Sequence, residues 1–276
     1  MNPAHPASLL LLVAALAGAA EKSEYSGHAP VRDAAWMNER PTKDKMLTSA
    51  QELDIAGQLV DLPGRLLAAE FAQGGKVLLV KTTSVLASIN PATLAIIQKA
   101  DFPVAKEGGS MHGLAVARDG ATVVISGGKT FLYQATISPE GKISWGKSID
   151  VSGGAKNVNP LGLAITDDGK HALVALSMSN TLALVELGSG KILSTTPVGI
   201  CPYGVALSAD NHTAYVSNFG GNAPGAHDLA ETSGGSLVAV DKRTIPLRGT
   251  LSFIEVSGDT LKERSRTEVG LHPTEL

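Results

Sequence analysis

Apolar and polar residues alternate along most of the chain in short runs that end at turn residues, a pattern typical of half-buried β-strands. One phrase, made of an alternating run, a turn and a second alternating run, recurs over residues 65–80, 113–125, 162–174 and 204–216. Its turn residues are Gly75, Gly120, Gly169 and Asn211, at spacings of 45, 49 and 42 residues. Glycine and asparagine tolerate the positive φ of a tight hairpin turn. Each phrase therefore predicts a β-hairpin.

A second hairpin follows each of the first three phrases. These hairpins pair residues 85–89 with 94–98, 131–137 with 143–149, and 181–186 with 192–196. Two hairpins make a four-stranded unit, and a repeat length in the forties is typical of propeller blades. The sequence predicts an all-β protein: a β-propeller of four-stranded antiparallel blades over residues 51–276, with about four complete blades and the start of another.

The end of the chain has the form of an approach to a further repeat. Val269-Gly-Leu-His-Pro273 matches Val198-Gly-Ile-Cys-Pro202, which stands directly before the hairpin that begins at Gly204. A propeller closes into a ring to remove its sheet edges. This match predicts a fragment of a longer protein, with open edges through which the chain associates.

The first twenty residues contain no Asp, Glu, Lys or Arg, and Leu9–Ala20 is an unbroken run of apolar and small residues. Twelve residues are too few to span a bilayer, which needs about 20. We interpret residues 1–20 as a signal peptide and 21–50 as a linker or N-terminal arm, which predicts a periplasmic or secreted protein with no membrane span after signal removal. Met1–Ser8 lacks Lys and Arg, so an uncleaved anchor and a different start codon stay open as alternatives.

Composition narrows the possible partners. The 276 residues are 43% hydrophobic and 18% charged, with a net charge of −3, which is ordinary for a folded protein. No run of Lys and Arg offers a surface to phosphate groups, so we expect no nucleic acid partner. Cys201 is the only cysteine. We expect it to be a buried core residue, and the spacing of Cys and His suggests no zinc site and no cofactor.

Two segments carry a family resemblance. Pro202-Tyr-Gly-Val-Ala-Leu-Ser-Ala-Asp-Asn211, followed by Ala214-Tyr-Val-Ser-Asn218, resembles the YVTN-type propeller repeat. Thr250–Val256 and Val269–Thr274 are similar to secreted bacterial members in which this propeller precedes a phosphoesterase domain. The resemblance implies a seven-bladed ring, with any metal-dependent hydrolysis in a C-terminal domain that this chain does not contain.

Candidate ligand-binding residues lie where loops of successive blades meet at one end of the predicted channel. Corresponding positions at this mouth are Ser110, Asn159, Cys201 and His272, joined two residues later by His112, Leu161, Tyr203 and Thr274. A long insertion in the fourth blade, residues 218–235, reaches the same face and adds Asn218, His227 and Asp228. An extra strand is expected over Ser236–Val240, before residues 241–248 lead back into the blade. Long loops are where binding residues often stand.

Each of these candidates has a second interpretation. His227, Asp228 and Glu231 are either metal ligands or part of a solvated acidic loop, and their spacing fits no established metal site. His112 and His272 are either catalytic residues or hydrogen-bonding loop residues. We assign no catalytic residue and no metal ligand from the sequence.

Two functions follow from this pattern. The first is an exported propeller that binds an unknown ligand or protein partner, accessory to a downstream phosphoesterase domain, with no catalysis expected in this chain itself. The alternative is a hydrolase of the propeller lactonase type, which needs His, Glu and Arg to converge on the channel. His112, His272 and Arg65 are the residues available for that role in these blades.

Overall fold

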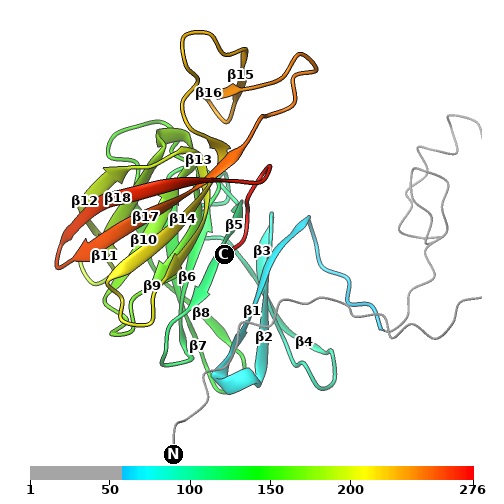
Figure 1. Ribbon diagram of the computed structural model, residues 1–276. Helices are drawn as coiled ribbons and strands as arrows, with labels where there is room; N and C mark the ends of the chain where they lie inside the picture. Colours follow the sequence, from blue (N-terminus) through cyan, green and yellow to red (C-terminus); the bar gives the residue numbers. More distant parts are fainter. Residues whose placement is uncertain (1–57) are drawn as a thin grey trace, which may run out of the picture. The chain divides into compact units, whose positions relative to one another are not determined.

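The chain forms four antiparallel sheets of four strands each, which follow one another around an axis (Figure 1). The computed structural model describes residues 58–276, so the predicted signal peptide at 1–20 and arm at 21–50 lie outside the described residues. Residues 59–276 form one compact unit. The prediction of an all-β propeller with four complete blades is confirmed.

Each blade runs from its inner strand to its outer strand in chain order. Blade 1 contains β1 (Leu66–Ala72), β2 (Val77–Thr82), β3 (Val85–Ile89) and β4 (Ile96–Asp101). Blade 2 contains β5 (Gly109–Val116), β6 (Thr122–Gly127), β7 (Phe131–Ile137) and β8 (Ile143–Asp150). Blade 3 contains β9 (Pro160–Ile165), β10 (His171–Leu176), β11 (Thr181–Glu186) and β12 (Lys191–Pro197). Blade 4 contains β13 (Ile200–Leu207), β14 (Thr213–Gly221), β17 (Gly249–Ser257) and β18 (Thr260–Val269).

The first hairpin of each blade turns where the sequence predicts. Gly75, Gly120, Gly169 and Asn211 have φ values of 89°, 72°, 68° and 59°. The second hairpins agree closely, except that β4 begins at Ile96 rather than at residue 94. Two short 3-10 turns, η1 (Gln73–Gly75) and η2 (Ser177–Ser179), are the helical elements of the described residues.

Blade 4 contains the predicted insertion between its second and third strands. Within it, β15 (Ala230–Ser233) and β16 (Ser236–Ala239) pair as a separate two-stranded sheet. Figure 1 shows this hairpin standing beyond one end of the blades. The strand expected over 236–240 is therefore present, but its partner is β15 and not a strand of the blade.

The apolar core lies between neighbouring blades. On β6, Val123 and Ile125 pack with residues of blade 1, whereas Val124 packs with residues of blade 3. Successive side chains of a strand point to opposite faces of its sheet. Alternate side chains of β6 therefore pack against blade 1 and against blade 3, and we call each such contact between neighbouring blades a joint. A third apolar cluster joins blades 3 and 4 in the same way.

Inner strands approach each other at a repeated glycine. A Cβ atom added to Gly113, Gly162 or Gly204 would lie 2.0, 2.3 or 2.4 Å from a carbonyl oxygen of the next segment. Those oxygens belong to Leu161, Tyr203 and Thr274. The first two precede the glycine of the next inner strand. Thr274 makes the corresponding contact from the residues after β18, which agrees with the predicted start of a further repeat.

Candidate functional site

The predicted channel mouth is built from the beginnings of β5, β9 and β13 and from the residues after β18. Asn159, Cys201 and His272 share a left-handed backbone, with φ values of 46°, 51° and 51°, and each precedes a proline. Blade 2 differs, because Ser110 at the corresponding position does not have a positive φ, whereas Gly108 has a φ of 62°. Figure 1 shows the C-terminal end turning inward to finish beside β5.

The side chains of His112, Tyr203 and Glu275 meet at this mouth; the first two were predicted from the sequence. The ring of His112 stacks on the ring of Tyr203, with centroids 5.2 Å apart and planes inclined by 22°. His112 Nδ1 lies 3.5 Å from Glu275 Oε1. Burial lowers the pKa of His112, and the charge of Lys81 adds to this, while Glu275 acts in the opposite sense.

Lys81, on β2, lies directly behind His112 and is fully buried. Its ammonium group donates to Ser110 Oγ at 3.1 Å, to the His112 carbonyl oxygen, and to the Gly113 carbonyl oxygen at 3.1 Å. Three acceptors match the three donors of an ammonium group. Burial nevertheless lowers the pKa of Lys81 well below its usual range.

Sequence reasoning missed Lys81, although a signal for it existed. Lys81 is the fifth residue of its second strand, where the other blades have Ser126, Ala175 and Ser217. A lysine at a position that strand alternation places on a buried face is unusual. Comparing the repeats with one another would have found it.

Further charges surround the mouth. Partial desolvation raises the pKa of the Glu70 carboxyl, and repulsion from Glu275 raises it further. Desolvation also raises the pKa of Tyr203, with a contribution from Glu275 that the positive charge of Arg65 opposes. Arg65, Glu70 and Glu275 thus act electrostatically on the region that His112 and Tyr203 occupy.

Cys201 lies under the turn of the β15–β16 hairpin. Its thiol donates to the Ser233 carbonyl oxygen at 3.4 Å, and its backbone N–H donates to Asn180 Oδ1 at 2.9 Å. Its side chain is buried, as predicted, and burial raises the pKa of the thiol. Cys201 therefore links the β15–β16 hairpin to the blades.

The other candidates are spread apart. Asn218 is fully buried inside blade 4, where its amide donates to Thr250 Oγ1 and Ser252 Oγ at 3.1 and 2.9 Å. His272 is exposed and stacks on Phe219, with ring centroids 4.1 Å apart. His227 and Asp228 are exposed, and Asp228 Oδ2 accepts the Gly225 N–H at 2.8 Å. Over residues 58–276, no group of three or more His, Cys, Asp or Glu residues is placed to hold a metal ion.

Comparison with known proteins supports the fold but identifies no family. No family model matches the chain, and no curated protein matches it in sequence. A functionally unknown protein from Desulfotomaculum acetoxidans DSM 771 superimposes with a TM-score of 0.54 at 16% identity, covering 75% of this chain and 57% of that one. Kuenenia stuttgartiensis hydrazine synthase gives 0.55 at 17%, covering 80% and 53%. A hypothetical selenium-binding protein from Sulfolobus tokodaii gives 0.54 at 9%, covering 74% and 55%.

The chain has a β-propeller fold. At these identities the likeness concerns the fold alone. The chain spans little more than half the length of the solved chains that it matches. Among the described residues of the propeller, no helix is long and apolar enough to cross a membrane.

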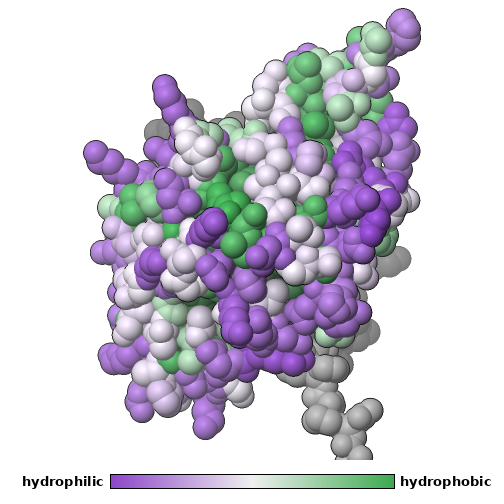
Figure 2. Space-filling model, turned by 90° about the vertical axis from the view of Figure 1, so that its left-hand side faces the viewer, coloured by the Kyte–Doolittle hydropathy of each residue, from purple (hydrophilic) through white to green (hydrophobic). Residues whose placement is uncertain are grey.

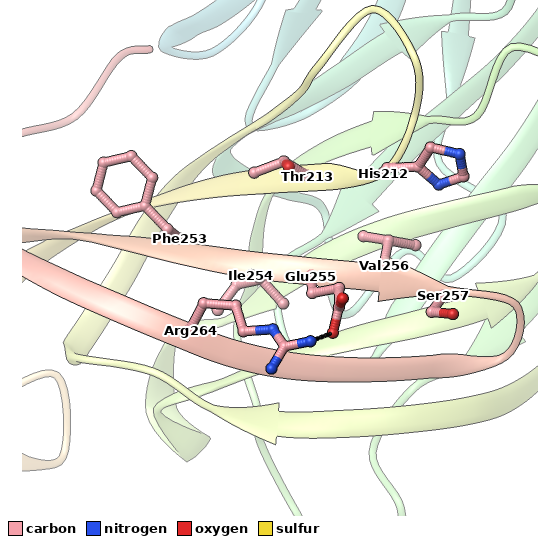
Figure 3. Close-up of a pocket in the computed structure, with 8 residues that line it drawn as sticks. All are labelled: His212, Thr213, Phe253, Ile254, Glu255, Val256, Ser257 and Arg264. Carbon is pink, nitrogen blue, oxygen red and sulfur yellow. Dashed lines mark hydrogen bonds and ion pairs between the residues drawn. The ribbon is translucent and has the colours of Figure 1, made fainter.

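A surface groove lies at the opposite end of blade 4 from the insertion (Figure 3). His212, Phe253 and the ion pair between Arg264 and Glu255 line it, from β14, β17, β18 and the turn before β14. The two charges neutralise each other within the groove. Arg65, Glu70, His112 and Glu275, in contrast, influence one another at the channel mouth.

Proposed function

We propose that this propeller is an exported protein-binding scaffold that recognises its partner through the insertion of blade 4. We call residues 222–247 the insertion arm. The supporting observation is that the arm carries strongly exposed apolar side chains as well as buried ones.

The apolar residues of the arm differ sharply in exposure. Val238, Ala239 and Val240 are 2%, 8% and 6% exposed. Leu229 and Leu237 are 55% and 58% exposed. Figure 2 shows hydrophobic surface on the projection at the top of the molecule. Exposed apolar residues on a projecting element are typical of protein–protein contact surfaces.

The arm is held in position by the blades beneath it. Asn180 Nδ2 donates to Ser236 Oγ at 2.8 Å, and Cys201 Sγ donates to the Ser233 carbonyl oxygen. Within the arm, a β-bridge joins Val240 to Pro246. A surface that is ordered before binding loses less conformational entropy when a partner binds. These contacts support a preformed recognition element.

The experiment compares two variants of the full chain. The pair Leu229→Ser and Leu237→Ser removes the two strongly exposed leucines of the arm, and Leu66→Ser, at 61% exposure on β1, is the matched control. Each is used to retain proteins from an extract of the source organism, and retained species are identified by mass spectrometry. We expect one species that the wild type and the control retain and the double variant loses, with an affinity decrease of roughly 30-fold in purified form. If every retained species binds all three chains equally, the arm is not the recognition element.

Export and association with a phosphoesterase domain extend this proposal. Residues 1–20 support export, and the YVTN-type repeat at 202–218 supports the association. Sequencing the locus beyond the codon for Leu276 tests the second point. An open reading frame that passes through further hairpins into a metal-rich domain would support it, whereas an immediate stop codon would contradict it.

A propeller lactonase-type hydrolase is the second candidate. Its supporting observation is the group of Arg65, Glu70, His112 and Glu275 around the channel mouth. Full-length protein should then hydrolyse simple lactones, and His112→Gln should lower the rate at least tenfold. Absence of hydrolysis, or an unchanged rate in the variant, would contradict this function.

A further inference from the structure

We propose, resting on the function proposed above, that the insertion arm binds its partner by strand addition at the free edge of β15. An extended segment of the partner protein pairs with this edge and places a basic residue, between two apolar residues, opposite Glu231. The backbone of β15, the exposed Leu237 and the charge of Glu231 each support one part of this description.

The turn of the hairpin fixes which backbone groups of β15 face outward. Gly234 and Gly235 form a two-residue turn with φ values of 55° and 80°, and Ser233 lies opposite Ser236. Residues that flank a turn of this kind exchange hydrogen bonds, and bonded and non-bonded pairs alternate along antiparallel strands. Thr232 and Ala230 therefore direct their N–H and C=O groups away from β16.

Two hydrogen bonds farther along the arm agree with this alternation. The Val240 N–H donates to the Leu229 carbonyl oxygen at 2.8 Å, which makes these two residues a bonded pair. Ala239, opposite Ala230, accepts the Leu247 N–H at 3.0 Å. The far edge of β16 is thus partly occupied by the arm itself.

The edge of β15 has no such neighbour. It pairs with β16 alone, and over residues 58–276 the backbone groups of Ala230 and Thr232 form no hydrogen bond. An exposed edge strand with open N–H and C=O groups is a template for another strand. These four groups are the backbone part of the binding site.

Leu237 supplies the apolar part. Val238 is 2% exposed, and its Cγ2 would lie 3.0 Å from a Cβ added to Gly220 of β14, so Val238 faces the blade. Side chains alternate along a strand, and Leu237 accordingly points to the other side, where it is 58% exposed. Thr232 and Ala230 lie on that side too and are short. An apolar side chain of an added strand can reach across them toward Leu237.

Glu231 supplies the charge. It is exposed and takes part in none of the ion pairs of the described propeller. A residue of the added strand opposite Glu231 forms a non-bonded pair, in which side chains come closest. Opposite charges stabilise such a pair and like charges destabilise it. A basic residue is favoured there, whereas a second copy of β15 would place its own Glu231 against this one.

The experiment uses the isotope-labelled full chain and the peptide acetyl-Thr-Ile-Arg-Ile-Thr-amide. We expect the amide proton signals of Ala230 and Thr232 to shift on binding and their hydrogen exchange to slow, while the amide of Glu231, already bonded to β16, changes little. One control peptide has Glu in place of Arg, and another has N-methyl groups on both Ile nitrogens. Each control peptide should bind at least fivefold more weakly, because it loses the charge pair or the strand hydrogen bonds.

Two variants and one control test the edge itself. Thr232→Pro removes an N–H that β16 does not use and should lower the affinity at least fivefold, whereas Thr232→Val keeps the N–H and should bind as the wild type does. Glu231→Lys should reverse the preference between the Arg and Glu peptides. The proposal is overturned if Ala230 and Thr232 do not respond to the peptide, if the N-methylated peptide binds equally well, or if Glu231→Lys leaves the preference unchanged. Self-association of the full chain that Thr232→Pro abolishes would also overturn it, since a second copy would then be the occupant.

Failure of this inference is distinguishable from failure of the proposed function, which is read from the species lost by the Leu229→Ser and Leu237→Ser pair. If Thr232→Pro and Glu231→Lys still retain that species, the arm recognises it without strand addition, and this inference alone is overturned. Loss of the species in Thr232→Pro and its retention by Thr232→Val would support strand addition.

Discussion

The joint between blades 1 and 2 and the joint between blades 2 and 3 contain the same hydrogen bond, made by different side chains. In both, the fifth residue of the second strand donates to the carbonyl that precedes the next inner-strand glycine. Lys81 does this at the first joint and Ser126 at the second. Blade 3 has Ala175 at this position and relies on close approach of Gly162 to the Tyr203 carbonyl.

This comparison distinguishes close backbone approach, which is enough to join two blades, from a side-chain donor, which is additional. Close backbone approach is common to the joints after blades 2, 3 and 4, while a side-chain donor is present after blades 1, 2 and 4. Close backbone approach is therefore sufficient to join two blades, because blade 3 has Ala175 at the donor position. The lysine adds a buried amine at the mouth, where burial lowers its pKa well below the usual range.

The largest expected effect comes from blocking the close approach itself. In Gly162→Ala, the new Cβ would meet the Tyr203 carbonyl oxygen at 2.3 Å, and backbone atoms cannot move away cheaply. We expect a loss of about 3 kcal/mol in the free energy of unfolding, measured by urea denaturation. Gly188→Ala, which has no atom within 4 Å of its added Cβ, is the matched control and should stay near the wild type. Equal stability of the two variants would contradict the role of the glycine.

Removing the lysine donor should cost less. Lys81→Met leaves Ser110 Oγ and two carbonyl oxygens without this donor, but it also removes the cost of burying a polar amine. The net loss should be about 2 kcal/mol in the free energy of unfolding. Lys76→Met, at an exposed position just before β2, should change it by less than about 0.5 kcal/mol. A variant at Lys81 as stable as the control would show that the first joint, like that after blade 3, needs no donor.

The neutral donor should contribute least to stability. Ser126→Ala leaves the Leu161 carbonyl oxygen without its 2.6 Å partner, and we expect a loss of about 1 kcal/mol by urea denaturation. Ser84→Ala, at an exposed position just before β3, serves as the control. If Ser126→Ala exceeds Lys81→Met in its effect, the ranking of the two joints is wrong.

The smallest effect concerns the titration of His112. Its pKa lies below 6.5 because burial and Lys81 disfavour the charged ring, while Glu275 favours it. Glu275→Gln should lower this pKa further and Lys81→Met should raise it, as measured by NMR of the ring carbons. Shifts in the reverse directions would contradict the electrostatic description of the mouth.

The same shift has a consequence for stability. Between the lowered pKa and 6.5, the unfolded state binds more protons at His112 than the folded state does. The contribution of His112 therefore falls as the pH drops through this window and is constant above it. Urea denaturation of His112→Gln and the wild type at pH 5 and pH 7 should show a difference that depends on pH in this sense.

Much of the fold was predictable because the relevant signals are local. Alternation and turn residues gave the hairpins within about two residues, and the interruption after Asn218 gave the insertion. Its internal pairing was only partly predictable, since residues 236–240 read as a strand but the partner at Ala230–Ser233 alternates weakly.

The candidate site was less predictable than the fold. His112 and Tyr203 do meet at the mouth, whereas Asn218 is enclosed in blade 4 and His227 and Asp228 stand exposed on the arm. Lys81, Glu70 and Glu275 were absent from the predicted set. Their importance arises from neighbours that are distant in sequence, so no local pattern reveals it.

By itself, the sequence determined the strands, their turns and the inner-strand glycines, because these depend on backbone preferences and on alternation within a few residues. Tertiary structure alone decided which side chains share the mouth. Blade stacking buries Lys81 behind His112, and the residues after β18 turn back to bring Glu275 against the imidazole. Such encounters depend on how successive blades pack around the axis, and the local pattern of residues leaves that packing open.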